Sequence, residues 1–239
     1  MAGILFIISA PSGSGKSTLV HELRSRVADL EFSVSWTTRS PRGSEQNGRE
    51  YHFTDRVTFE HMVAGGDFLE HAEVFGNLYG TAVQSLREAE ARGKDLLLDI
   101  DVQGAAQVRQ RVPEAVSVFI MPPNKDVLAA RLRSRSRAEG VFTPETEQIV
   151  ERRLAQAARE IENYRQYGYI LVNDILEQAT EQLAAIVISE RIRKSGLQPG
   201  PEERRAIELA ESCRQANATA RLLPVLISFG LFKEETVST

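Results

Sequence analysis

The chain has 239 residues, of which 42% are hydrophobic and 26% charged, values typical of a globular protein large enough to bury one substantial core. Its formal net charge of −4 argues against a protein that coats nucleic acid without sequence preference, and no apolar run is long enough to span a membrane. The single cysteine, Cys213, excludes an internal disulfide, and the short N-terminal apolar run lacks the basic flank of a signal sequence. We therefore expect a cytoplasmic protein with no nucleic-acid or membrane partner.

The N-terminal segment has the pattern of a strand, a glycine-rich turn and a helix. An apolar run at Ile4–Ile8 predicts a buried strand, and the turn Ala10–Ser17 (APSGSGKS) follows it. Apolar residues at helical spacing come next, at Leu19, Val20, Leu23 and Val27. This order is typical of a Walker A loop, which binds the phosphates of a nucleoside triphosphate.

The residue types in this loop suit phosphate chemistry. Gly13 and Gly15 permit backbone angles that a Cβ would forbid, so successive N–H groups converge on one anion. Lys16 supplies a cation for the β- and γ-phosphates, and the Ser17 hydroxyl is a ligand for Mg²⁺. Ala10 stands where the motif usually has its first glycine, and a small residue there still permits the turn.

Three further apolar runs predict buried strands. They are Leu96–Asp101, Val116–Ile120 and Tyr169–Val172, and helical patterns separate them along the chain. Strands that alternate with helices predict a parallel sheet with helices on both faces and its ligand site at the carboxyl ends of the strands. The predicted fold class is therefore α/β, of the P-loop NTPase type.

Two segments depart from this alternation. Residues 33–93 contain short alternating runs broken by glycine and proline, which predicts a small mixed α+β insertion. Residues 125–153 carry six closely spaced arginines, for which a solvated helix face and a mobile helical lid over phosphates are equally good interpretations. These arginines are Arg131, Arg133, Arg135, Arg137, Arg152 and Arg153.

Several spaced motifs in the insertion and beyond it resemble those of guanylate kinases. The motifs are Ser35–Arg42, Gly48–Phe53, Phe68–His71 and Gly76–Thr81, together with the phosphate loop, the LLLDID and ILVND strands and the RLRSR segment. The resemblance covers residues 4 to about 193. It implies a P-loop kinase core (1–32, 94–124 and 154–195), a GMP-binding insertion (33–93), a lid (125–153) and a C-terminal helical extension of unknown role (196–239).

The resemblance implies transfer of the γ-phosphoryl group of Mg·ATP to GMP, and to dGMP, in purine nucleotide metabolism. Cations and hydroxyl groups would hold the GMP phosphate, since guanidinium groups donate hydrogen bonds in pairs. Guanine presents N1–H and a 2-amino group and so needs acceptors, which adenine does not satisfy. The matching GMP-binding positions are Ser35, Arg39, Arg42, Tyr51, Glu70, Tyr79, Thr81 and Asp101.

The same resemblance implies the residues around ATP and the metal. Those expected at ATP are Ala10, Pro11, Ser12, Gly13, Ser14, Gly15, Lys16, Ser17, Thr18 and Asn173. Ser17 is expected to bind Mg²⁺ directly and Asp99 through water, while Asp101 faces the nucleotide, a division that the sequence alone does not fix.

Transfer is expected to depend on electrostatics, because the acceptor is an ionised phosphate that needs no general base. The expected catalytic residues are Lys16, Arg39, Arg42, Arg131, Arg135 and Arg153. Three features depart from the family pattern. Arg135 is flanked by serines where the family has glycine, and residues 140–144 look like a short insertion. The loop Gly43–Glu45 also differs in its order and is expected to contact nothing essential.

Beyond Gly196 the resemblance ends. The break at Gln198–Pro201 precedes a predicted helix with an apolar face, and residues 222–232 are apolar enough to require a covering partner. That partner is either the kinase core or a second copy of the chain in a homo-oligomer.

Two other functions share part of this evidence. A different P-loop kinase, such as one that phosphorylates a ribose bisphosphate, would need the loop and lid but not Glu70 and Ser35 as base readers. The other is a non-catalytic guanylate-kinase-like binding module, a class of protein whose phosphate loop is degraded. The intact Gly15-Lys16-Ser17 argues against this second function.

Overall fold

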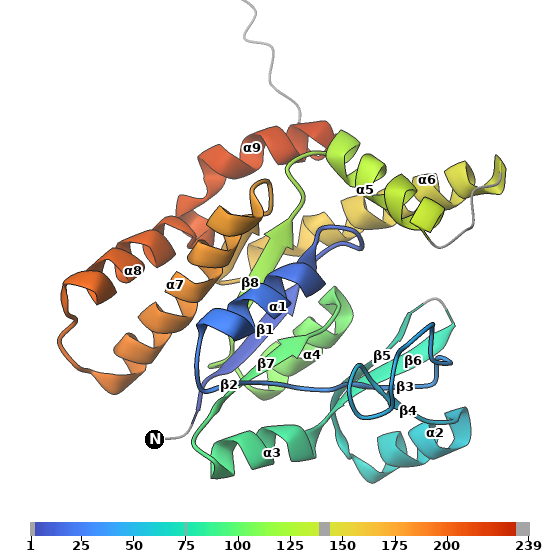
Figure 1. Ribbon diagram of the computed structural model, residues 1–239, viewed down its shortest axis with the longest axis horizontal. Coiled ribbons are helices and arrows are strands. Elements are labelled where there is room, and N and C mark those ends of the chain that lie inside the picture. The colour runs from blue at the N-terminus through green and yellow to red at the C-terminus, as the bar shows by residue number, and fades with distance from the viewer. Residues whose placement is uncertain (1–2, 75, 139–143, 233–239) are drawn as a thin grey trace, which may run out of the picture. The chain divides into compact units, whose positions relative to one another are not determined.

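The computed structural model describes residues 3–74, 76–138 and 144–232. Two compact units divide the chain, one of Met1–Ile8 and Val27–Ser117 and the other of Ser9–Arg26 and Val118–Thr239 (Figure 1).

The first unit contains three parallel strands in the order β2-β7-β1, namely Leu30–Phe32, Asp95–Asp99 and Leu5–Ser9. Every residue of β1 is buried, as the apolar run predicts. Helices α3 (Val83–Ala91) and α4 (Val102–Arg111) flank β7 in sequence. The Asp101 side chain caps α4 by accepting a hydrogen bond from the Gly104 amide at 2.8 Å.

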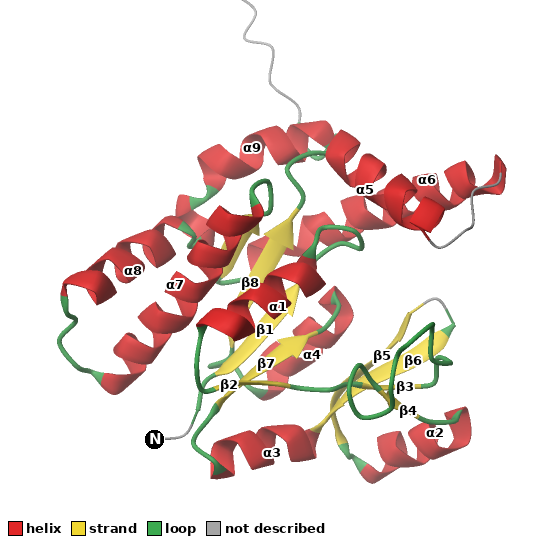
Figure 2. Ribbon diagram, in the orientation of Figure 1, coloured by secondary structure: helices red, strands yellow, loops and turns green. Residues whose placement is uncertain are grey.

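A second sheet in the same unit has the order β4-β3-β6-β5 (Figure 2). Its strands are His52–Phe53, Trp36–Thr37, Asn77–Ala82 and Phe68–Val74, and helix α2 (Arg56–Gly65) lies between β4 and β5 in sequence. β5 and β6 are antiparallel, with Glu70 opposite Thr81 and a bulge between Phe68 and Glu70. This is the mixed α+β insertion that the sequence predicts.

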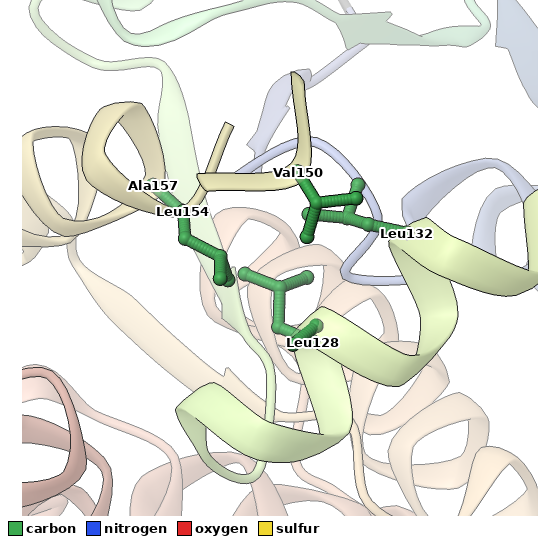
Figure 3. Packing of buried hydrophobic residues seen from close by; sticks show 6 residues of the cluster. Leu128, Leu132, Val150, Leu154 and Ala157 are labelled. Carbon is green, nitrogen blue, oxygen red and sulfur yellow. The ribbon is translucent and has the colours of Figure 1, made fainter. Parts of the chain in front are cut away.

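The second unit holds α1 (Lys16–Arg26), the parallel pair β8 (Val116–Met121) and β9 (Tyr169–Val172), and the long helix α7 (Leu176–Ser195). Helices α5 (Lys125–Ala138) and α6 (Pro144–Ile161) pack against each other, and their facing apolar side chains make a small core (Figure 3). The residues of this core are Leu128, Ala129, Leu132, Val150, Leu154 and Ala157. A short 3₁₀ helix, Glu162–Gln166, connects α6 to β9.

The segment after Gly196 folds onto the second unit. Helix α8 (Pro201–Ser212) lies beside α7 (Figure 1), and α9 (Thr219–Ser228) follows a 3₁₀ turn at Gln215–Asn217. Between α8 and α9 the backbone runs along the edge of β9, where the Ile170 amide donates to the Cys213 carbonyl at 2.8 Å. Phe229 packs against the α5–α6 core. The apolar face of the segment therefore has partners within its own chain.

The α/β fold class and all four predicted strands of the parallel sheet are confirmed. Strand β2 was missed because it is three residues long and carries a charge at Glu31. No helix among the described residues combines the length and the apolar character needed to cross a membrane. Most of the predicted insertion at 140–144, residues 140–143, lies outside the described residues.

Candidate active site

The loop between β1 and α1 has the geometry of a phosphate cradle. Gly13 and Gly15 have φ values of 89° and 86°, in the left-handed region that favours glycine. A Cβ at Gly15 would lie 2.4 Å from the amide nitrogen of Asn173, so only glycine fits there. Among the described residues Asp29 is the one non-glycine with positive φ, so Ala10 has an ordinary backbone. That explains why the loop accepts alanine at its first position.

Two side chains hold this loop against the end of β9. The buried Asn173 amide donates to the Ser14 carbonyl at 2.8 Å. The Arg131 guanidinium donates to the Ser14 carbonyl at 3.4 Å and to the Asn173 carbonyl at 3.1 Å. The Ser14 hydroxyl is buried and has no hydrogen-bond partner among the described residues. A buried polar group without a partner is often found at a functional site.

The sequence-predicted lid arginines have different surroundings. Arg131 contacts the phosphate loop, whereas Arg133 pairs with Glu147 of α6 through bonds of 3.0 and 3.1 Å. Arg135 is exposed on α5, and Arg153 is half-buried on α6. Lys16, the first residue of α1, is half-buried, and Ser17 and Thr18 next to it are exposed. The structure thus places one lid arginine directly on the loop.

In the first unit, the side chains of Arg39 and of two tyrosines lie close together. The guanidinium of Arg39 lies 5.3 Å from the centre of the Tyr51 ring and interacts with the side chain of Tyr79. The rings of Tyr51 and Tyr79 meet edge to face at 5.9 Å. This cluster combines a positive charge with phenolic hydroxyl groups, the chemistry that binds a phosphate.

The carboxylate of Glu45 also belongs to this cluster. Glu45 accepts two hydrogen bonds of 2.9 Å from Arg39, and it accepts one of 2.8 Å from the backbone amide of Arg42. Burial alone would raise the pKa of the Glu45 carboxyl, but the Arg42 amide and the Arg39 guanidinium hold that pKa below its ordinary value. The loop Gly43–Glu45, which was expected to contact nothing essential, thus contacts Arg39, a residue expected to bind the GMP phosphate. The side chain of Arg42 itself is exposed.

A buried carboxylate lies on β5 of the same unit. Glu70 is 3% exposed and accepts a 2.7 Å hydrogen bond from the Thr81 hydroxyl on β6. Its other oxygen faces Gly104 so closely that a Cβ there would lie 2.4 Å away, and the same Cβ would lie 3.4 Å from an oxygen of Asp101. Glu70, Thr81 and Asp101 thus form a set of acceptors, which is the chemistry that guanine requires.

The electrostatics of Glu70 follow from its burial. Burial raises the pKa of the Glu70 carboxyl from 4.5 to about 7, and the charge of Asp101 adds to the rise. The hydrogen bond from Thr81 and the charge of Arg111 oppose it. A carboxyl with such a pKa is a recognised mark of a functional site.

The remaining predicted residues lie at strand ends of the first unit. Ser35 precedes β3 and is half-buried; its carbonyl accepts a hydrogen bond from the His52 amide at 2.9 Å. Asp99, the last residue of β7, is also half-buried. Asp99 therefore lies at the carboxyl end of a parallel strand, where open α/β folds bind ligands.

Comparisons with known proteins give a consistent result. A family model described as guanylate kinase matches residues 3–190. The guanylate kinase of Koribacter versatilis is 57% identical over 229 residues, covering 96% of this chain and 97% of that protein. The guanylate kinase of Nitrosococcus oceani is 47% identical, with 80% and 91% covered. A crystal structure of guanylate kinase from Anaplasma phagocytophilum superposes with a TM-score of 0.64 at 32% identity, covering 80% of this chain and 87% of that one.

Proposed function

The chain belongs to the guanylate kinase family, and from this premise we propose that it transfers the γ-phosphoryl group of Mg·ATP to GMP, and to dGMP, giving ADP and the nucleoside diphosphate. The observation that carries the choice of acceptor is the buried carboxylate of Glu70, bonded to Thr81 and close to Asp101. Guanine offers N1–H and 2-amino donors to such acceptors. Adenine leaves them unpaired, at a cost of about 1–3 kcal/mol for each buried group.

On the donor side, the loop from Ala10 to Thr18 supplies backbone N–H groups for the ATP phosphates, and the helix N-terminus adds favourable partial charge. Lys16 is proposed to neutralise the β- and γ-phosphates, and its position as the first residue of α1 supports this role. Asn173 fixes the loop through the Ser14 carbonyl. A Cβ at Gly15 would collide with the Asn173 side chain and disturb that contact. The need for glycine at this position supports a role for the loop in phosphate binding.

The residues available for Mg²⁺ have the right chemistry. The exposed hydroxyl of Ser17 and the carboxylate of Asp99 are hard oxygen donors, and Mg²⁺ takes few protein ligands while keeping several waters. We assign Ser17 as the direct ligand and Asp99 as a ligand through water. When bound, the ion supplies charge neutralisation at the phosphates.

On the acceptor side, Arg39, Tyr51 and Tyr79 form the group that would hold the GMP phosphate, with Arg42 joining from the adjacent loop. Glu45 orients the Arg39 guanidinium through their ion pair. We assign Ser35 to guanine binding as well, together with Glu70, Thr81 and Asp101.

Phosphoryl transfer then needs alignment and charge neutralisation, and it needs no protein base because the acceptor oxygen is already ionised. Lys16 acts on the donor phosphates, and Arg39 and Arg42 act on the acceptor phosphate. Arg131, Arg135 and Arg153 are proposed to stabilise the charge of the transferred group when the lid segment moves. The bonds from Arg131 to the loop and to the Asn173 carbonyl support the first of these assignments.

We also propose that the protein works in the cytoplasm and forms a homo-oligomer through the C-terminal segment. The charge and the single cysteine support the first proposal. The exposed Ile227 and Phe232 near the end of that segment support the second.

The direct test of the function is chromatographic detection of GDP and ADP from GMP and Mg·ATP. Lys16→Met should lower kcat by about 10³-fold, because a preorganised cation at the transferred charge is lost, while GMP binding measured by calorimetry stays close to that of the parent. Parent-like turnover in Lys16→Met would contradict the assignment of roles.

A further inference from the structure

Helix α4 contacts the strand that carries Glu70 through polar side chains for which the proposed function has no role. β5 is an edge strand of its sheet, paired with β6 on one side. Its other side contacts α4. Gly104, Gln107 and Arg111 are spaced three and four residues apart, so they lie on one face of that helix.

Gln107 pairs with the backbone of His71 as a neighbouring strand would. The His71 amide donates to Gln107 Oε1 at 3.2 Å, and Gln107 Nε2 donates to the His71 carbonyl at 2.7 Å. One side-chain amide thus satisfies both backbone groups of the residue that follows Glu70. Edge backbone groups that are buried without a partner carry a large cost, so this pairing fixes the strand at that point.

Arg111 holds the residues on the other side of Glu70. One guanidinium nitrogen donates to the carbonyls of Phe68 at 2.6 Å and Leu69 at 2.9 Å. These carbonyls belong to the bulge that interrupts the pairing of β5 with β6 just before Glu70. A bulge redirects the side chains next to it, and here its free carbonyls have a cationic partner.

We propose that Gln107 and Arg111 are positioning residues for guanine recognition, which hold the backbone on both sides of Glu70 so that its carboxylate stays aligned with the N1–H and 2-amino groups of the base. The inference rests on the proposed role of Glu70. Gly104, on the same helix face, leaves the space that this alignment needs.

The two residues differ in charge, and this gives them separable effects. The groups that act on the Glu70 carboxyl are Thr81 from β6 and Asp101 and Arg111 from the two ends of α4. The Arg111 guanidinium lowers the pKa of Glu70, whereas Gln107 is neutral. Loss of Arg111 raises that pKa further, so ionised Glu70 becomes scarcer near neutral pH. Loss of Gln107 changes alignment alone.

The test compares Gln107→Leu and Arg111→Met in steady-state assays with GMP and IMP as acceptors. Misalignment of the carboxylate should raise the KM for GMP about tenfold in each variant with kcat nearly unchanged, and the preference for GMP over IMP should shrink. As the pH is lowered, the KM for GMP should begin to rise at a higher pH in Arg111→Met than in the parent. In Gln107→Leu the rise should begin at the same pH as in the parent. Arg111→Lys, which keeps the charge, should recover part of the loss.

Arg56→Met is the matched control. Arg56 also reaches β5, through Glu73 at 3.3 Å, but it bonds no backbone group beside Glu70. Its KM for GMP should equal that of the parent. Thermal unfolding and the KM for ATP show whether each variant is folded.

Folded Gln107→Leu and Arg111→Met proteins with the parent's KM for GMP and the parent's GMP:IMP ratio would overturn the proposal. Glu70→Gln separates this failure from failure of the proposed function. If Glu70→Gln loses the preference for GMP while the α4 variants keep it, the positioning role alone is wrong. If Glu70→Gln also keeps it, guanine is not read by Glu70 at all.

Discussion

At the scale of single residues, Glu70 combines nearly complete burial with a task that requires charge. The free protein favours the protonated form up to a pH near 7, whereas a guanine edge that donates two hydrogen bonds favours the ionised form. Binding of GMP should therefore release a proton from this carboxyl at neutral pH.

The pH dependence of GMP binding follows from this conflict. Between pH 6 and pH 8 the fraction of ionised Glu70 rises through its pKa of about 7, so the dissociation constant for GMP should fall by about tenfold. Calorimetry at several pH values measures it. Glu70→Gln is the control, because it keeps the titration of the GMP phosphate and lacks the carboxyl; the same profile in both proteins would refute the account.

The sign for stability is the opposite. The folded pKa of Glu70 lies above its ordinary value of 4.5, so its contribution is fully present below about pH 4.5 and is lost as the pH rises through about 7. In the absence of GMP, the free energy of unfolding should therefore fall more in the parent than in Glu70→Gln as the pH rises from 5 to 8. Thermal unfolding at pH 5 and pH 8 gives the comparison.

At the scale of elements, the segment after Gly196 belongs to the packing of the second unit. Glu190 of α7 is 3% exposed and accepts hydrogen bonds from Tyr169, Arg193 and Arg214. The Arg214 guanidinium also lies 4.4 Å from the centre of the Tyr169 ring. This cluster joins β9 and α7 to the segment that connects α8 and α9.

Arg214→Met tests the cluster. It leaves a buried carboxylate with one charged partner, Arg193, whose side chain is 61% exposed. The free energy of unfolding in urea should fall by about 3 kcal/mol, the lower end for a broken buried pair. Arg204→Met, which removes an exposed arginine of α8 that donates to the Pro199 carbonyl, should cost under about 1 kcal/mol. Equal losses of unfolding free energy in the two variants would show that the Glu190 cluster stabilises the fold no more than an exposed surface contact does.

The sequence predicts elements well where periodicity is strong and poorly where tertiary contacts decide. The apolar runs that became β1, β7, β8 and β9 are unambiguous, and the loop before α1 follows from its glycines and its lysine. Glu45, Gln107 and Arg111 escaped prediction because their roles depend on contacts with distant backbone and side chains. The three-to-four spacing of Gly104, Gln107 and Arg111 after a helix-capping aspartate was the available signal for two of them.

At the scale of the whole molecule, the proposed homo-oligomer requires an exposed apolar surface on the C-terminal segment. The buried side chains of the C-terminal segment, among them Cys213, Leu222 and Val225, have partners within their own chain. An interface must therefore use what stays exposed, such as Ile227 at 37% and Phe232 at 47%. Removing the segment would strip the edge of β9, so a surface change in the intact chain is the better probe.

Ile227→Glu should lower the mass measured by light scattering if the proposed homo-oligomer forms through this face, because a charge there opposes burial. Ser228 is unsuitable as a control since it bonds the Lys125 amide, whereas Val57, 62% exposed on α2, serves as Val57→Glu. An unchanged mass in Ile227→Glu would reject an interface at this face.

The measurement that bears most directly on the account is ADP release from Mg·ATP with a panel of acceptors: GMP, dGMP, IMP, AMP, UMP, CMP and a ribose bisphosphate. We predict the highest kcat/KM with GMP, a weaker one with IMP, which lacks the 2-amino group, and negligible turnover with AMP. Preference for a ribose bisphosphate would indicate a different P-loop kinase. Binding of GMP without turnover of any acceptor would indicate a binding module and contradict the proposed reaction.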